Sequence, residues 1–253
     1  MRRKRNLSGW LAIVGFGLFA TGLVGTGPVE TATPLRADGL VYQLPEDGTW
    51  VRYKATMTFS SGGKVGEVTG TVTISSVGKR TTEDQGPCRW IEISSELSDG
   101  KAKQVSVGKF LIPETALVKG HNPRNFIVKA WGKDAAGVKE EGELPEDVGS
   151  MLDMLFHGPL DNSKPISEAT VKTKLGELKA AGVSGTRTRE LGSATETMQL
   201  TVAARNHEKV PFGVLDYATK YVVKGGAAAQ EGTMRLIYDD SGDKAVSKMP
   251  EQD

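Results

Sequence analysis

The chain has 253 residues, among them 32 Lys and Arg, 31 Asp and Glu, and one cysteine. The basic residues gather at the start, and the part from Asp38 onward carries 27 basic and 30 acidic side chains. A nucleic-acid-binding domain needs a clear basic excess on one face, so this composition argues against a nucleic-acid partner. The lone Cys88 excludes a disulfide within the chain, and we interpret it as a small buried strand residue.

The N-terminal segment, residues 1–37, is predicted to be an export signal or an N-terminal anchor. Residues 2–5 are all basic and residues 10–25 are almost entirely apolar, which is the pattern of a secretory signal. As a helix the apolar stretch would be about 24 Å long, whereas the hydrocarbon core of a bilayer is roughly 30 Å thick. We therefore expect an exported protein of the periplasm or cell envelope. The segment is either cleaved or kept as an inner-membrane anchor over residues 7–27, and no cysteine follows it that could carry a lipid.

A flexible lead over residues 38–48 precedes a first pair of predicted strands. In residues 51–59 the odd positions are apolar and the even positions polar, while in residues 67–75 the even positions are the less polar ones. Gly62 and Gly63, between the two runs, indicate a hairpin turn. Each strand therefore has one apolar and one polar face, as in an antiparallel sheet that is covered on one side.

Similar alternation returns along the rest of the chain. The further runs are residues 89–97, 104–112, 126–131, 170–178, 197–204, 214–223 and 233–239. With the first pair, these seven runs make about nine strands, more than the four to six that are commonest in one sheet. We predict a mainly β protein with a single β-rich domain over residues 49–240 and a loose tail over residues 241–253.

One segment, residues 144–159, changes from the strand period to the helix period. Its apolar residues fall at positions i, i+3, i+4, i+7 and i+8, and they are Val148, Met151, Leu152, Leu155 and Phe156. This spacing predicts an amphipathic helix. A prolyl residue, Pro145, suits the first turn of such a helix, and Gly158 suits its end.

The predicted sheet is much wider than the predicted helix. Nine strands about 4.8 Å apart span roughly 43 Å, whereas a helix is about 10–12 Å thick. We therefore predict a large curved antiparallel sheet, a half-barrel, with one amphipathic helix packed on its concave face. The uncovered part of that face would be an apolar groove, and such grooves bind acyl chains or other apolar ligands.

This layout resembles the periplasmic lipoprotein-carrier fold of the LolA/LolB group and related exported proteins. The resemblance rests on the export signal, the strand count, the mid-chain helix and the run VPFGVLDYATKYVV at residues 210–223, and it covers residues 50–239. It implies a curved antiparallel sheet that wraps around helices and shelters lipid. The chain departs from the carriers in having one clear helix and no lipidation cysteine.

These observations lead to two hypotheses about function. The first is an exported binding module that shelters a lipid-like or other apolar ligand between sheet and helix. The residues expected to line that groove are Tyr53, Met57, Phe59, Ile91, Ile93, Met151, Leu155, Leu215 and Tyr217. The alternative is a structural or envelope protein-interaction domain with a closed core and no ligand, whose partner is another envelope protein.

Residues that would carry catalysis or bind a metal form no recognisable motif. His121, His157 and His207 are too far apart in sequence to follow a metal-binding pattern. His157 suits the C-terminal end of the predicted helix, and the other two suit turns. The five carboxylates in residues 139–147 are best interpreted as a solvated loop that leads into the helix. We therefore expect no enzyme activity, no catalytic residues, no metal site and no cofactor.

Overall fold

The computed structural model describes the greater part of the chain after residue 38. The described residues are 39, 41–61, 64–117, 121–138, 141–142, 144, 148–149, 152, 156, 158–190, 197–225 and 230–250. The described residues all belong to one compact unit, Pro34–Asp253. The predicted export signal lies outside the described residues, so it stays a prediction. Within the described part of the chain, no helix is long and apolar enough to cross a membrane.

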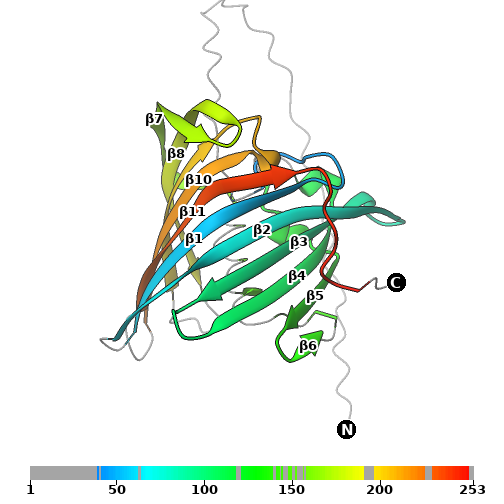
Figure 1. Ribbon diagram of the computed structural model, residues 1–253, viewed down its shortest axis with the longest axis horizontal. Helices are drawn as coiled ribbons and strands as arrows, with labels where there is room; N and C mark the ends of the chain where they lie inside the picture. The colour runs from blue at the N-terminus through cyan, green and yellow to red at the C-terminus, as the bar shows by residue number, and fades with distance from the viewer. Residues whose placement is uncertain are drawn as a thin grey trace, which may run out of the picture. The chain divides into compact units, whose positions relative to one another are not determined.

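Eleven strands, all paired antiparallel, form one sheet in the described residues (Figure 1). They are β1 (Trp50–Ser61), β2 (Lys64–Thr82), β3 (Gly86–Ser98), β4 (Lys103–Pro113), β5 (Lys129–Asp134), β6 (Gly137–Val138), β7 (Asp161–Thr173), β8 (Gly176–Glu190), β9 (Thr197–Asn206), β10 (Val214–Lys224) and β11 (Gln230–Gly242). Three short 3-10 helices connect some of them: η1 (Glu114–Ala116), η2 (Pro123–Phe126) and η3 (Pro211–Gly213).

The strand order is β6-β5-β4-β3-β2-β1-β11-β10-β9-β8-β7, so the first and last strands pair at the centre of the sheet. Figure 1 shows a strongly twisted single layer in which β7 and β8 lie far from β5 and β6. The sheet is therefore open, with β6 and β7 at its two edges. The prediction of a mainly β protein built on one large antiparallel sheet is confirmed.

One predicted strand, residues 170–178, is in fact the end of β7 and the start of β8. The Thr173 hydroxyl donates a hydrogen bond to the Gly176 carbonyl at 2.9 Å and accepts one from the Leu175 N–H at 3.0 Å. Gly176 has a φ of +98°, a conformation that glycine adopts without strain. The apolar Leu175 at the tip hid this turn, because it continues the alternation of the run.

The alternation predicted for β1 decides which face of the sheet carries the core. Val51, Tyr53 and Ala55 are buried on one face, which we call the inner face, while Lys54 and Thr56 are exposed on the other, the outer face. The inner-face residues of the neighbouring strands join them in one continuous hydrophobic core. The prediction of one apolar and one polar face is correct for the centre of the sheet.

Several connecting segments contribute to the cover of the inner face. The buried residues that these segments contribute to the core include Val41, Ala116, Leu117, Val148, Leu152, Phe156, Val210 and Phe212. They come from the N-terminal lead, from η1, from the segment predicted as a helix and from the connection between β9 and β10. The apolar surface that the predicted helix could not cover is therefore largely buried by connecting segments.

The predicted amphipathic helix falls mostly on residues outside those described. The backbone is helical at Val148, Gly149 and Leu152, and the Phe156 N–H donates to the Leu152 carbonyl at 2.9 Å, as one helical turn requires. No helix of seven or more residues occurs among the described residues. A complete helix over residues 144–159 therefore stays a prediction, although its three described apolar residues are buried as expected.

The outer face of β3, β4 and β5 is covered as well, by residues 244–250, which we call the C-terminal strap. The Glu92 carboxylate accepts hydrogen bonds from the Ser247 hydroxyl at 2.7 Å and from the Lys248 N–H at 3.0 Å. Met249 is buried in a second cluster whose other members are Cys88, Trp90, Val107, Leu111 and Trp131. Figure 1 shows this last segment of the chain crossing the strands. Residues 244–250 of the tail that was predicted to be loose are therefore held in place, because the Glu92 carboxylate and two tryptophans of the outer face contact the strap.

Candidate functional site

Most residues that were predicted to line an apolar groove lie in the packed core. Tyr53, Ile91, Ile93, Leu215 and Tyr217 are all buried and belong to the inner-face core. Met57 is partly buried against the same core, and Phe59 is 45% exposed near the β1–β2 turn. Met151 and Leu155 lie outside the described residues. Five of the nine residues therefore lie together, as part of the packed core and not as the wall of a groove.

Tyr53 and Tyr217, the two tyrosines of this set, are fully buried in the core. The Tyr53 hydroxyl donates a hydrogen bond to the Val214 carbonyl at 3.2 Å. Burial raises the pKa of Tyr53 and that of Tyr217 far above the ordinary value for tyrosine, so both stay neutral. Neither is among the described residues that line the cavity of the next paragraph.

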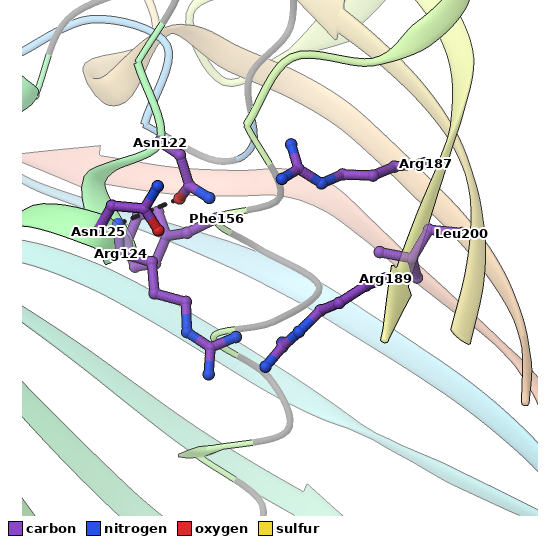
Figure 2. Close-up of a pocket in the computed structure, with 7 residues that line it drawn as sticks. All are labelled: Asn122, Arg124, Asn125, Phe156, Arg187, Arg189 and Leu200. Carbon is purple, nitrogen blue, oxygen red and sulfur yellow. Dashed lines mark hydrogen bonds between the residues drawn. The ribbon is translucent and has the colours of Figure 1, made fainter. Parts of the chain in front are cut away.

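A cavity of about 290 Å³ opens between the sheet and the segments that cover its inner face. Its lining residues define what we call the arginine site: Asn122, Arg124, Asn125, Phe156, Arg187, Arg189 and Leu200 (Figure 2). On one side of the cavity, the lining residues belong to β8 and β9. On the other side they belong to η2, to Asn122 just before it, and to the segment that contains Phe156. None of the nine residues predicted to line an apolar groove is among the described residues that line this cavity, and its walls are mostly polar and cationic.

Strand alternation in β8 places two of the arginines on the inner face. Arg187 pairs with Leu200 of β9 and Arg189 pairs with Met198, and both of these partners are buried in the core. Residues two apart in a strand point to the same side, so both guanidinium groups extend over the inner face. The Arg187 guanidinium also donates a hydrogen bond to the Pro159 carbonyl at 3.2 Å, which helps to fix its direction.

The third arginine reaches the cavity from the opposite side. Asn122 caps η2, and its side-chain oxygen accepts a hydrogen bond from the Arg124 N–H at 3.1 Å. Pro123 occupies the first helical position, where its missing N–H costs nothing. This local arrangement holds η2 in place, and Figure 2 shows Arg124 extending from it toward Arg189.

The site concentrates positive charge. None of the described residues that line the cavity is acidic. Burial lowers the pKa of Arg124, and the positive charge of Arg189 lowers it further. Guanidinium and amide groups can donate several hydrogen bonds to the oxygens of a bound anion.

The residues considered for metal binding or catalysis do not meet in the described structure. His121 stacks on Phe126 with ring centroids 6.2 Å apart, next to Asn122. The ring nitrogen of His207 accepts a hydrogen bond from the Lys209 N–H at 3.1 Å, as expected for a turn residue. His157 lies outside the described residues. No group of three or more His, Cys, Asp or Glu residues that could hold a metal occurs in the described ranges.

Sequence reasoning missed the arginine site. One signal was present in residues 187–189, where two arginines alternate with a threonine. Earlier inner-face residues of the same strand, such as Ala180 and Val183, are apolar. Basic residues on the apolar face of a strand indicate a functional role when they are not at an exposed edge. The contribution of Arg124 could not be read from the sequence, because it depends on how η2 folds back over the sheet.

Comparisons with known proteins add little. No protein-family model matches the chain, and no curated protein matches it. A crystal structure described as a "putative lipoprotein" from Parabacteroides distasonis is similar at 10% sequence identity and a TM-score of 0.29. That match covers 81% of this chain and 99% of the other. The similarity is too low to carry a site or a function over, and the resemblance to the LolA/LolB group stays a prediction.

Proposed function

We propose that this protein is an exported β-rich binding protein that holds an anionic ligand in the arginine site. The observation that supports this proposal best is that Arg124, Arg187 and Arg189, from two separate elements, line one cavity together with Asn122 and Asn125. Guanidinium groups bind the oxygens of anions through charge-assisted hydrogen bonds, so a cavity lined by three of them is suited to an anionic ligand.

The proposed ligand also has an apolar part. Phe156 and Leu200 line the cavity beside the arginines. Ligand sites commonly combine an apolar wall with a few polar groups that orient the ligand. The lipid-like ligand expected from the sequence is compatible with this arrangement if its acidic group occupies the arginine site. A purely apolar ligand is not what three guanidinium groups would select.

The alternative, a protein-interaction domain that docks its partner on a sheet edge, receives less support. The long edge strand β7 contains Pro165, and its pairing with β8 shifts register near Lys164 and near Ala169. Prolines and bulges are the usual means by which natural proteins prevent an edge strand from pairing with another chain. Strand addition at β7 is therefore disfavoured, and we place this function second.

Substitution of the β8 arginines tests the proposal. We expect Arg187→Gln and Arg189→Gln each to weaken binding of inorganic phosphate or sulfate by about tenfold or more, because a hydrogen bond to a charged group contributes roughly 1.5–3 kcal/mol. Isothermal titration calorimetry on the purified chain measures this effect. Arg80→Gln, at an exposed position of β2, is the matched control and should leave binding unchanged.

Thermal unfolding separates a binding role from a structural role. If the arginines serve a ligand, both glutamine variants should lose anion binding, while their stability without ligand falls by no more than the loss of a hydrogen bond such as that from Arg187 to the Pro159 carbonyl, about 0.5–1.5 kcal/mol. A loss of several degrees without any change in anion binding would assign the arginines to the fold. Absence of anion binding by the wild-type chain would refute the proposed function.

A further inference from the structure

We propose that the outer face of β3, β4 and β5 is a recognition groove for an extended segment of another protein, and that the C-terminal strap is its built-in, displaceable occupant. The segment that fits this groove has a hydroxyl residue, then a lysine, then a long apolar side chain, as Ser247, Lys248 and Met249 have in the strap. This inference concerns a surface separate from the arginine site and does not depend on the proposed function.

One residue of the strap, Lys248, is held at its backbone and at its side chain. Its N–H donates a hydrogen bond to the Glu92 carboxylate at 3.0 Å, and its carbonyl accepts one from the Lys133 ammonium group at 3.4 Å. Its own ammonium group donates to the Ser94 hydroxyl at 3.0 Å and lies 3.6 Å from a Glu96 carboxylate oxygen. Side chains of the sheet therefore recognise this residue, without the backbone ladder that an added strand would form.

The next residue of the strap packs against two tryptophans. Met249 is 4% exposed and belongs to the outer-face cluster with Trp90 and Trp131. The Lys109 ammonium group lies 5.4 Å from the centroid of the Trp90 ring, and that of Lys129 lies 5.5 Å from the centroid of the Trp131 ring. These cation–π contacts help to hold both rings in place. In peptide recognition, hydrogen bonds to the backbone give affinity and places for side chains give specificity, and this surface offers both.

A buried carboxylate distinguishes the groove from a simple cover. Glu92 is 2% exposed, and it accepts hydrogen bonds from the Ser247 hydroxyl at 2.7 Å and from the Lys248 N–H. Burial of a carboxylate costs free energy, and an apolar residue of similar volume would often hold a covering segment as well or better. The carboxylate instead selects a segment that brings donors to it. Selection of this kind is what a recognition site needs, and a cover that serves stability alone does not need it.

The strap is lightly attached to the rest of the fold. It follows β11 through residues 243–246, of which Asp243, Lys244 and Val246 are exposed. The Ala245 N–H donates a hydrogen bond to the Gly48 carbonyl at 2.7 Å, and the described strap residues belong to no strand. Segments with few buried contacts open at a lower free energy than the core does. The strap can therefore leave the groove while the sheet stays folded.

The strap competes with any incoming segment. Because it is tethered, its effective concentration at the groove is roughly millimolar. The strap of a second copy presents the same residues and therefore gains nothing over the tethered one. A different protein gains when its segment fits the groove better or when it makes contacts elsewhere. We therefore assign the groove to such a partner, and the strap keeps the groove closed until the partner binds.

A peptide that copies the strap tests whether the groove accepts a segment from outside the chain. The probe is fluorescein-labelled DKAVSKMP, residues 243–250, and fluorescence anisotropy measures its binding to full-length chains. The double variant Ser247→Ala/Met249→Ala weakens the tethered strap and leaves every groove residue unchanged. We expect this variant to bind the peptide about tenfold or more tightly than the wild-type chain does, because competition from the tethered strap is reduced.

Two kinds of control accompany this measurement. Val246→Ala is the matched control chain, because Val246 is 81% exposed, and it should bind the peptide as weakly as the wild-type chain does. In the peptide itself, Met249→Ala removes the side chain that packs on the tryptophans, and Lys248→Glu places a carboxylate beside Glu96. Each change should weaken binding to the double variant by about tenfold or more. All three peptides are compared on the same folded chain, so a loss of stability cannot produce the difference.

The outcomes decide between a recognition groove and a cover. Equal binding of DKAVSKMP by the double variant and the wild-type chain, including no binding by either, would overturn the inference. Equal binding of the three peptides by the double variant would overturn it as well. Light scattering on the wild-type chain at roughly millimolar concentration tests the choice of occupant. A monomer supports a separate partner, whereas a dimer that excess peptide dissociates would assign the groove to a second copy and overturn that choice.

Discussion

The C-terminal strap offers the sharpest test of the structure, through the substitution Met249→Ala. The Met249 side chain is 4% exposed and packs in the outer-face cluster with Trp90 and Trp131. Truncation of a buried methionine costs about 2–5 kcal/mol. We expect a value near 2 kcal/mol, because the strap pairs with no strand and can move partly into the space that the substitution leaves. For a domain of this size such a loss lowers Tm by about 4–8 °C.

Urea unfolding followed by tryptophan fluorescence measures this free energy of unfolding. The rings of Trp90 and Trp131 have centroids 5.2 Å apart and adjoin Met249, so the native emission spectrum should change as well. Val246→Ala is the control on the same strap, because Val246 is 81% exposed and should change the free energy by less than about 0.5 kcal/mol. Equal unfolding midpoints for the two variants would refute the packing described here and would support a loose tail.

Two further predictions follow from the packing of glycines and from the hydrogen-bond network around Asp47. Gly70→Ala should cost about 1–3 kcal/mol in urea unfolding, because a Cβ there would overlap the Glu96 carbonyl oxygen of β3. Gly66→Ala should cost less, since the obstacle is the half-exposed ring of Phe59, and equal costs would contradict this reasoning. Burial alone would raise the pKa of Asp47, but hydrogen bonds from Ser76 and from the Gly78 N–H, with the charge of Arg89, lower it overall. Asp47 therefore stabilises the fold above its unfolded pKa, near 3.9, and this contribution is lost as the pH falls through the lower folded pKa. Asp47→Asn should accordingly lower the urea midpoint at pH 6 but not at pH 2, and a difference that is the same at both values would argue against the network.

The strands at the centre of the sheet were readable from local sequence. Alternation in residues 51–59 identified β1 and its inner face, because side chains in a strand point to opposite sides with a period of two. The same rule failed at residues 170–178, where an apolar residue occupies a turn and the alternation continues through it. It also gave no warning that β3 and β4 are buried on both faces, since Glu92 and Lys109 read as solvent-facing residues.

The arginine site shows the same division between local and tertiary information. That Arg187 and Arg189 share a face follows from their spacing in β8. The sequence spacing does not say that this face is the inner one or that Arg124 meets the two arginines there. Both depend on contacts between residues more than sixty positions apart in the chain.

The amino-acid sequence by itself determined the strand class, the alternating faces and the absence of a recognisable catalytic motif, because these follow from neighbouring residues. Only the tertiary structure decided what covers each face of the sheet. Connecting segments bury the inner face, the C-terminal strap covers part of the outer face, and three arginines meet at one cavity. The physical reason is that burial and electrostatic repulsion depend on distances in space, which the order of residues along a strand does not set.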